Sequence, residues 1–395
     1  MPSYWFRNTG NTATNLASNW SLTDGGGATG LVPTSLDDAY FTSNSGNCIP
    51  STGFVCKILI FSGVGAGNYS NIFTITNAIT VSGNVTLSST MTITGTQYIT
   101  INATATLTSN GKTWTGGFGL TNPITVTLAD NWVITGNILI TSGAIVINGN
   151  QITLNGGMTC GGSPAPTLSG TTTLVFGNGT FSGAGGNGVS NNITINSAGS
   201  VSVGTSGSPF ILNGGTFTYT AGTITQAYLT LNGAAFTFNT SGMNFNAITT
   251  GGFTSPSTIT LASIWNVTSY TVGFSSASNQ NLTFAGTAGF NIGTLISNQA
   301  NKTITLVSGV TYNINTSITS LFGTSANHNK IISSIGGIKS ILTLKQGATQ
   351  DLSFVDFTDI DGLTNGQKTI CTYKGVLTNT SGIRLLPTDV QTIAY

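Results

Sequence analysis

A long uncharged stretch is the feature that most restricts how this chain can fold. No charged side chain occurs between Asp130 and Lys302, and charged residues make up only 5% of the whole sequence. Apolar residues make up 39%, which is too many for a disordered chain. The stretch must therefore form an ordered structure whose surface is kept in water by uncharged Gly, Ser, Thr and Asn.

The local pattern predicts short strands rather than helices. The chain contains no glutamate and no segment rich in Ala, Leu, Glu and Lys, so long helices are not expected. From about Phe73 onward, β-branched and polar residues alternate over four to six positions, as in 73–76 and 84–88. Asn-Gly pairs predict tight turns with positive φ between the strands. These pairs begin at residues 110, 148, 155, 178, 187, 213, 232 and 365.

An internal repeat indicates how the strands are arranged. Residues 212–219 align with residues 231–238 at an offset of 19, and the aromatic positions coincide. A repeat of this length is typical of one coil of a solenoid. Stacked coils bring equivalent residues about 4.8 Å apart, so we expect Phe217 to lie over Phe236.

The sequence thus predicts an all-β fold, a single-stranded parallel β-helix of right-handed winding with small β-rich caps. The flanking segments hold most of the charged residues, and charged ends prevent edge-to-edge growth of a solenoid. The predicted organisation is an N-terminal attachment and capping module at 1–65, a β-helical shaft at 66–345 and a C-terminal β cap at 346–395.

Two other all-β architectures fit the sequence less well. An outer-membrane barrel needs about 9–11 residues of alternation in each strand, and these runs stop sooner. An array of β-sandwiches also uses short alternating strands, and the regular register of the repeat argues against it.

Charge and hydropathy limit the partners. The formal net charge is +1 and the ten Lys and Arg residues form no cluster, so we expect no nucleic-acid partner. No apolar run approaches the roughly 20 residues of a membrane helix, and no membrane insertion is expected. The opening lacks a basic region followed by an apolar region, so we expect no Sec signal peptide. Nothing in the sequence calls for a cofactor.

Cys48, Cys56, Cys160 and Cys371 are few and widely spaced. The spacing of Cys48 and Cys56 matches no zinc or redox motif. We expect the cysteines to be small buried apolar residues, and a disulfide between Cys48 and Cys56 is the alternative.

The opening segment carries three short motifs, YWFR at 4–7, SNWS at 18–21 and VPTSLDDAYF at 32–41. It resembles the N-terminal segment of phage-encoded β-helix virion proteins, of the tail fibre, tailspike or capsid-appendage type, and of bacterial surface β-helices. The resemblance covers only this opening segment, from Tyr4 to Phe41. It implies a virion protein, made in the host cytoplasm, whose N-terminal module attaches it to other proteins of the capsid or tail. It also implies a homotrimer, because such shafts commonly form trimers.

Acidic residues near the C-terminus form the best candidate for a metal or catalytic site: Asp356, Asp359 and Asp361. In a strand, Asp359 and Asp361 would share one face at roughly 6.5–7 Å, which suits an acid/base pair or a hard cation. The alternative is a charged surface strand ending in an Asp-Gly turn. The only histidine, His328, has the setting of a solvated polar loop. The uncharged stretch offers no carboxylate pair, so we expect no enzyme activity.

Neutral Thr, Ser and Asn faces suit glycan binding, in which hydroxyl networks and ring stacking replace charge. The aromatic candidates are Trp114, Trp132 and Trp265, for which core or turn packing is the alternative. Frequent Thr-x-Thr motifs also suggest ice binding, but their spacings do not follow the period of the repeat.

Taken together, the sequence predicts a structural virion protein of a bacteriophage, a fibre, spike or capsid-decorating subunit that binds host-surface glycans. A bacterial cell-surface adhesin is the first alternative, and a polysaccharide depolymerase is the second.

Overall fold

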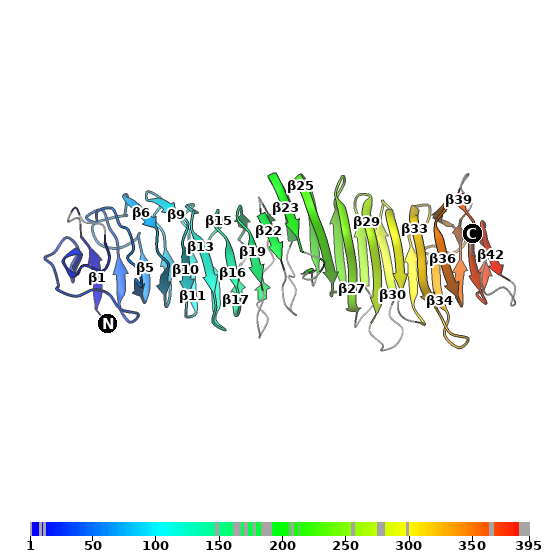
Figure 1. Ribbon diagram of the computed structural model, residues 1–395, viewed down its shortest axis with the longest axis horizontal. Coiled ribbons are helices and arrows are strands. Elements are labelled where there is room, and N and C mark those ends of the chain that lie inside the picture. The colour runs from blue at the N-terminus through cyan, green and yellow to red at the C-terminus, as the bar shows by residue number, and fades with distance from the viewer. Residues whose placement is uncertain are drawn as a thin grey trace. The chain divides into compact units, whose positions relative to one another are not determined.

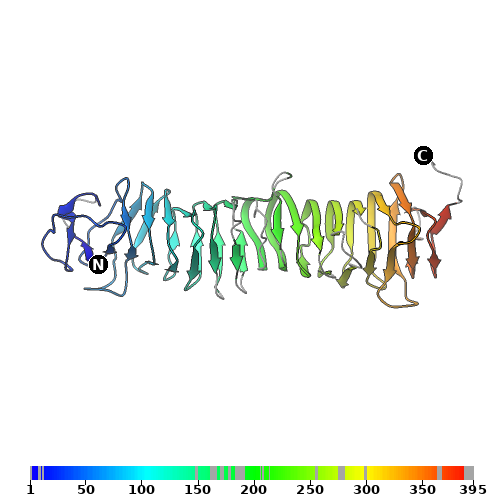
Figure 2. The same ribbon diagram turned by 90° about the horizontal axis from the view of Figure 1, so that it is seen from below.

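The computed structural model gives two units of the same kind. They comprise Met1–Ser202 with Ala221–Thr223, here the N-terminal unit, and Val203–Thr220 with Ile224–Tyr395, the C-terminal unit. In each unit, strands of successive coils pair in parallel and lie side by side (Figures 1 and 2), so the predicted all-β solenoid is confirmed. The structure describes residues 2–7, 10, 13–146, 150–160, 167–169, 173–176, 179–182, 192–204, 206, 209–212, 214–253, 257–274, 281–297, 300–362 and 367–386.

Helix is almost absent from these residues, as the sequence predicts. The described part of the chain has a single short 3-10 helix at Ala17–Asn19 and no α-helix. None of its helical segments has the length and apolar character needed to cross a membrane. The predicted right-handed winding stays a prediction.

In the N-terminal unit most strands form three rows that run from coil to coil, and β6 and β9 pair in a separate two-stranded sheet. Pairing follows β1-β3-β5-β8-β11-β14-β17-β20 in one row, β4-β7-β10-β13-β16-β19-β22 in the second and β12-β15-β18-β21-β23 in the third. The strands are β1 (Ser3–Phe6), β2 (Trp20–Ser21), β3 (Asp38–Tyr40), β4 (Val55–Cys56), β5 (Ile58–Ile60), β6 (Ile72–Ile75), β7 (Ile79–Val81), β8 (Val85–Thr86), β9 (Thr92–Gly95), β10 (Tyr98–Ile101), β11 (Ala105–Thr108), β12 (Thr113–Trp114), β13 (Gly117–Leu120), β14 (Thr125–Leu128), β15 (Trp132–Ile134), β16 (Ile138–Ile140), β17 (Ala144–Val146), β18 (Ile152–Leu154), β19 (Met158–Cys160), β20 (Thr167–Ser169), β21 (Thr173–Phe176), β22 (Gly179–Ser182) and β23 (Asn192–Val203).

In the C-terminal unit two long rows dominate. One runs β25-β26-β28-β30-β32-β34-β37-β41, and the other runs β25-β27-β29-β31-β33-β35. The strands are β24 (Phe210–Leu212), β25 (Gly215–Leu231), β26 (Ala235–Asn239), β27 (Asn244–Phe253), β28 (Ser257–Leu261), β29 (Trp265–Phe274), β30 (Asn281–Gly286), β31 (Phe290–Ser297), β32 (Thr303–Leu306), β33 (Thr311–Phe322), β34 (Asn329–Ser333), β35 (Ser340–Lys345), β36 (Thr349–Ser353), β37 (Val355–Thr358), β38 (Ile360–Asp361), β39 (Gln367–Lys368), β40 (Ile370–Tyr373), β41 (Leu377–Thr378) and β42 (Ile383–Leu386).

The coil length varies along the chain, although the internal repeat suggested a constant period. In the N-terminal unit, Tyr98 pairs with Gly117, at the interval that the repeat predicts. The C-terminal unit contains the same interval, where Tyr228 pairs with Ala247, and longer ones, where Ser257 pairs with Leu282 and Thr303 pairs with Lys330. Register also shifts inside some paired strands, as between Ile292 and Thr294 of β31.

The predicted stack of Phe217 over Phe236 is wrong by two positions. Phe217 pairs with Phe238, and their rings stack at a centroid separation of 6.0 Å. Gly215 is the residue opposite Phe236. The shift is an even number of positions, so the side chains keep their faces and Phe217 stays inside the coil.

Inward apolar columns form the core of each unit. One column of the C-terminal unit runs through Trp265, Phe290, Tyr312 and Leu342, which are buried and lie in successive coils. Burial of each such side chain contributes about 1.5–3 kcal/mol. Because every coil repeats the gain, the coils need no charged residues for cohesion.

An asparagine ladder on the outer side of the C-terminal unit links the coils through side chains. Asn291 donates from Nδ2 to Oδ1 of Asn266 at 2.9 Å, and Asn313 donates to Oδ1 of Asn291 at 2.8 Å. The Thr343 hydroxyl completes the ladder by donating to Oδ1 of Asn313 at 2.6 Å. The ladder residues are unequally spaced along the chain, so the sequence shows no repeat that would predict the ladder.

Two expectations about strands and turns need correction. β25 has 17 residues instead of four to six, because positions 215–218 pair with β26 and positions 228–231 pair with β27. One continuous strand thus serves both rows. The Asn-Gly pair at 110 has the predicted positive φ, but the pairs at 155 and 232 do not. The pairs at 148, 178, 187, 213 and 365 include residues outside the described part of the chain.

Gly156 is needed for close backbone packing instead of a turn. A Cβ at this position would lie 2.3 Å from the carbonyl oxygen of Gly136, and a Cβ at Gly136 would lie 2.1 Å from that of Gly116. The three glycines are evenly spaced in the sequence and let the backbones of successive coils meet at one corner.

The N-terminal end is closed by an antiparallel strand and an aromatic cluster. β2 pairs antiparallel with β1 at the edge of the row. Phe41 lies among the rings of Phe6, Trp20 and Phe61, at centroid separations of 5.1, 5.8 and 4.8 Å. Parallel pairing continues from β5 to β8 and from β33 to β36, across the predicted boundaries at 65 and 345. Those boundaries stay predictions.

Cys48 and Cys56 are buried and unpaired, so the interpretation as small apolar residues is confirmed for them and the disulfide is wrong. Burial raises the pKa of both thiols above their ordinary value. Cys371 is a free, half-buried thiol, and the side chain of Cys160 lies outside the described part of the chain.

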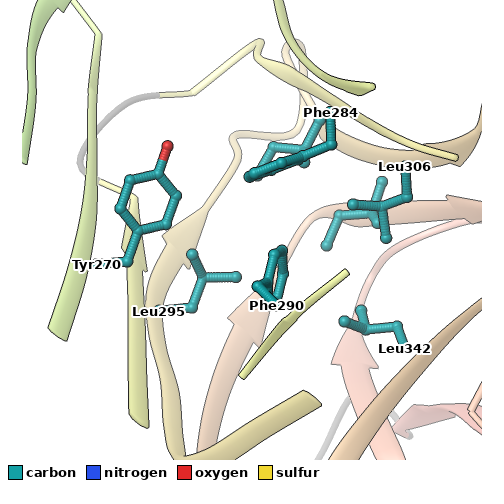
Figure 3. A pocket seen from close by; sticks show the side chains of 8 residues that line it. Tyr270, Phe284, Phe290, Leu295, Leu306 and Leu342 are labelled. Carbon is teal, nitrogen blue, oxygen red and sulfur yellow. The ribbon is translucent and has the colours of Figure 1, made fainter. Parts of the chain in front are cut away.

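Figure 3 shows a small cavity inside the C-terminal unit. It measures about 10 Å³, and the side chains around it, which include Phe284, Phe290 and Leu306, are apolar apart from the Tyr270 hydroxyl. That hydroxyl is buried and has no hydrogen-bond partner. Burial raises the pKa of Tyr270 above its ordinary value.

We predict opposite effects for two matched tyrosine substitutions. Tyr270→Phe removes an unpartnered buried hydroxyl and should raise the free energy of unfolding by about 1 kcal/mol. Tyr312→Phe removes the hydroxyl that accepts a 3.0 Å hydrogen bond from the Val307 amide, and should lower it by about 1–2 kcal/mol. Urea unfolding curves measure both changes, and equal effects would contradict the assignment of the hydrogen bonds.

Truncation of the N-terminal aromatic cluster should be costly. Phe41→Ala leaves a cavity among several rings and should destabilise the N-terminal unit by about 3–5 kcal/mol. Leu36→Ala is the control, since Leu36 is 65% exposed and should change stability by less than about 0.5 kcal/mol. Urea unfolding followed by tryptophan fluorescence measures the change in unfolding free energy of each variant.

Candidate functional site

The last coils bring together residues that are far apart in sequence. β34 pairs with β37, and Nδ1 of His328 lies 2.7 Å from Oδ1 of Asp356. The two side chains are 23% and 18% exposed. His328 lies in a loop, as predicted, but its side chain is half-buried and paired with Asp356 instead of solvated. A full coil separates the pair in the sequence, so no local pattern signalled this contact.

The Phe354 ring packs near His328, and the Tyr373 ring packs near Phe354. The rings of His328 and Phe354 are 5.4 Å apart, and those of Phe354 and Tyr373 are 6.4 Å apart. The Lys374 ammonium lies 5.6 Å from the Phe354 ring centroid and 5.0 Å from that of Tyr373. We call His328, Phe354, Asp356, Tyr373 and Lys374 the ring corner.

Single residues of positive φ turn the chain at the corners of these coils. Phe354 and Lys374 have φ of 53° and 55°, and Asp359 and Asn379 have φ of 55° and 50°. The two members of each pair belong to successive coils and are equally spaced in the sequence, so the same corner recurs. Asn and Asp tolerate this conformation, whereas a bulky residue such as Phe is uncommon there.

The three predicted aspartates each accept a hydrogen bond from the equivalent position of the next coil. Asp356 accepts from the backbone amide of Val376 at 2.8 Å, and Asp361 accepts from the Ser381 hydroxyl at 2.7 Å. Oδ1 of Asp359 accepts from the side-chain amide of Asn379. The carboxylates therefore tie one coil to the next.

The prediction that Asp359 and Asp361 share a strand face is wrong. Asp359 lies at the corner between β37 and β38, where its positive φ interrupts the strand. Within the described residues, no group of three or more His, Cys, Asp or Glu side chains is placed to hold a metal ion. A metal site at Asp356, Asp359 and Asp361 stays a prediction.

Hydrogen bonding sets the charge state of Asp359. The side-chain amide of Asn379 and the backbone amide of Gly337 both donate to its carboxylate and hold its pKa below the ordinary value. These hydrogen bonds keep the carboxylate ionised to a lower pH than an ordinary aspartate.

The three tryptophans proposed as sugar platforms lie inside the coils. Trp114, Trp132 and Trp265 are at most 4% exposed. Nε1 of Trp114 donates to the carbonyl of Gly117 at 3.1 Å, and Nε1 of Trp132 and of Trp265 have no partner. None of these rings presents a face to a ligand in solvent, because each fills an inward position of its strand.

Outward-facing threonines form columns along the coils. The irregular spacing of these threonines in the sequence did not predict the columns. Thr258, Thr283 and Thr305 are paired in successive coils. A second column consists of Thr216, Thr237 and Thr260. Each column covers three coils, and alanines take the matching positions at Ala235 and Ala285. The outer face here is neutral and rich in hydroxyl groups.

Comparison with known proteins adds no family to this description. No protein-family model matches the chain, and neither curated proteins nor solved structures gave a match. Its function is therefore inferred from its own residues.

We predict that Asp359 makes stability sensitive to acid. Its folded-state pKa is lower than the ordinary value of about 3.9, so its stabilisation is complete above about pH 4. The stabilisation is lost as the pH falls through the folded-state pKa. Asp359→Asn should therefore reduce the drop in melting temperature between pH 5 and pH 3.

The control is Asp351→Asn, because Asp351 is exposed. Melting temperatures of the three proteins are measured by circular dichroism across this range. The same acid-dependent drop in the Asp359→Asn variant and the parent would show that Asp359 does not contribute.

Proposed function

We propose that the chain is a structural virion protein of a bacteriophage, a fibre, spike or capsid-decorating subunit that binds host-surface glycans. Other proteins of the capsid or tail are its proposed partners, held through residues 1–65. The observation that carries the proposal is the arrangement of the N-terminal segment, in which aromatic motif residues are buried and several leucines are exposed.

The buried part of this segment fixes it to the solenoid. Tyr4, Phe6 and Trp20 belong to the motifs and are at most 5% exposed. The Arg7 side chain donates to the carbonyl oxygens of Gly26 and Ser18, which holds the loop against the first strand. An attachment module needs such a rigid base.

The exposed part suits contact with another protein. Leu22, Leu31 and Leu36 are 56%, 60% and 65% exposed. Three large apolar side chains exposed within positions 22–36 can contact a partner protein. The opening segment is also the part that resembles virion proteins, which supports the same role.

The outer faces of the coils support the glycan-binding part of the proposal. Threonine columns and the asparagine ladder present hydroxyl and amide groups, and residues 131–301 contain no charge. Such groups can donate to and accept from sugar hydroxyls. A homotrimer and the lack of enzyme activity are part of the proposal, and the homotrimer rests on the resemblance of the opening segment.

Virion association is the test. Particles purified from an infected culture should contain the chain, detected by mass spectrometry at a constant ratio to the capsid protein. Leu31→Asp with Leu36→Asp should reduce incorporation at least tenfold, whereas Ile264→Asp should leave it unchanged. Ile264 is the matched control because it is 54% exposed in the C-terminal unit.

Two outcomes would overturn the proposal. Recovery of the chain only in the cell-envelope fraction would identify a surface adhesin. Clearing of host capsule by the purified protein would identify a depolymerase.

A further inference from the structure

We propose that the ring corner binds a saccharide that carries a carboxylate group. This inference rests on the glycan-binding part of the proposed function and names the class of sugar and its site. It replaces the buried tryptophans with residues that solvent can reach. Phe354 and Tyr373 are half-buried, and Lys374 is exposed.

The rings provide a surface for the apolar face of a sugar. They come from three coils, with His328 before β34, Phe354 between β36 and β37, and Tyr373 at the end of β40. Binding sites for small ligands commonly combine aromatic side chains with a few polar groups that fix the orientation. This corner has both kinds of group.

The backbone at Phe354 is a second argument for a binding role. Its φ of 53° is a conformation that costs a bulky residue stability, and such strain gathers at binding sites. The neighbouring corner uses Asp359 and Asn379, which tolerate positive φ. Folding alone would favour a small polar residue at 354, so the ring is retained at a cost in stability.

The charges favour an acidic ligand. Lys330 is exposed and lies opposite Asp356 in the paired strands β34 and β37. With Lys374, two lysines thus accompany one aspartate. The Lys374 ammonium lies over the rings of Phe354 and Tyr373, so it can pair with the carboxylate of a sugar bound at these rings. Asp356, already oriented by His328, can accept from a sugar hydroxyl.

The test is a titration of the full chain with trigalacturonate, whose sugars carry carboxylates, and with neutral galactotriose. Isothermal titration calorimetry should show trigalacturonate binding at least tenfold tighter than galactotriose. Phe354→Asn should weaken trigalacturonate binding at least tenfold and leave the melting temperature equal or higher, because Asn fits the positive φ.

A charge variant and its control complete the test. Lys374→Gln should weaken trigalacturonate binding about threefold to tenfold and reduce its dependence on salt. Lys345→Gln is the matched control because Lys345 is also exposed, and it should bind like the parent. A stable Phe354→Asn variant that binds like the parent would overturn the site.

Two further results would overturn the sugar class. These are equal affinity for galactotriose and trigalacturonate, and no binding of trigalacturonate by the parent chain. Virion association is measured separately, so the two proposals can fail independently. If the chain binds trigalacturonate but is absent from particles, the proposed sugar site is supported and the proposed virion role is wrong.

Discussion

The structure depends on the in-register stacking of inward apolar side chains between parallel coils. The same contact recurs along the chain, as when Trp265, Phe290 and Tyr312 follow one another in successive coils. Each coil therefore gains its stability from its neighbours. Cohesion of this kind needs no ion pairs, which explains how a stretch of chain without charged residues can fold. Polar bonds such as those of the asparagine ladder follow the register that the apolar columns set.

The coils near the two ends of the chain carry additional contacts, which differ between the N-terminal and the C-terminal coils. At the N-terminal end, an aromatic cluster around Phe41 and the antiparallel strand β2 cover the first coil. In the last coils, carboxylates join equivalent positions of successive coils, and positive-φ corners turn the backbone. Charged residues are thus more frequent towards both ends of the sequence, and most non-glycine residues of positive φ lie in the last coils. Those places are also where our proposals for attachment and sugar binding lie.

Much of the fold could be predicted from the sequence, and most of the site could not. Alternating strands and a short internal repeat were enough to predict a parallel solenoid, because both patterns are local. The contact between His328 and Asp356 depends on coil lengths that differ from one coil to the next. For the same reason Phe217 lies over Phe238 instead of Phe236. Trp114, Trp132 and Trp265 are buried because each occupies the inward face of its strand. Composition alone does not reveal which face a residue occupies.

Cross-linking across one pair of coils tests the stacking most directly. Thr237 and Thr260 are outward partners in the paired strands β26 and β28. Cysteines at these two positions should form a disulfide under mild oxidation, because paired positions in adjacent strands have the required separation. Cysteines at Thr237 and Thr258 are out of register and should cross-link much less. Equal cross-linking of both pairs, or none in the first, would contradict a solenoid with this register.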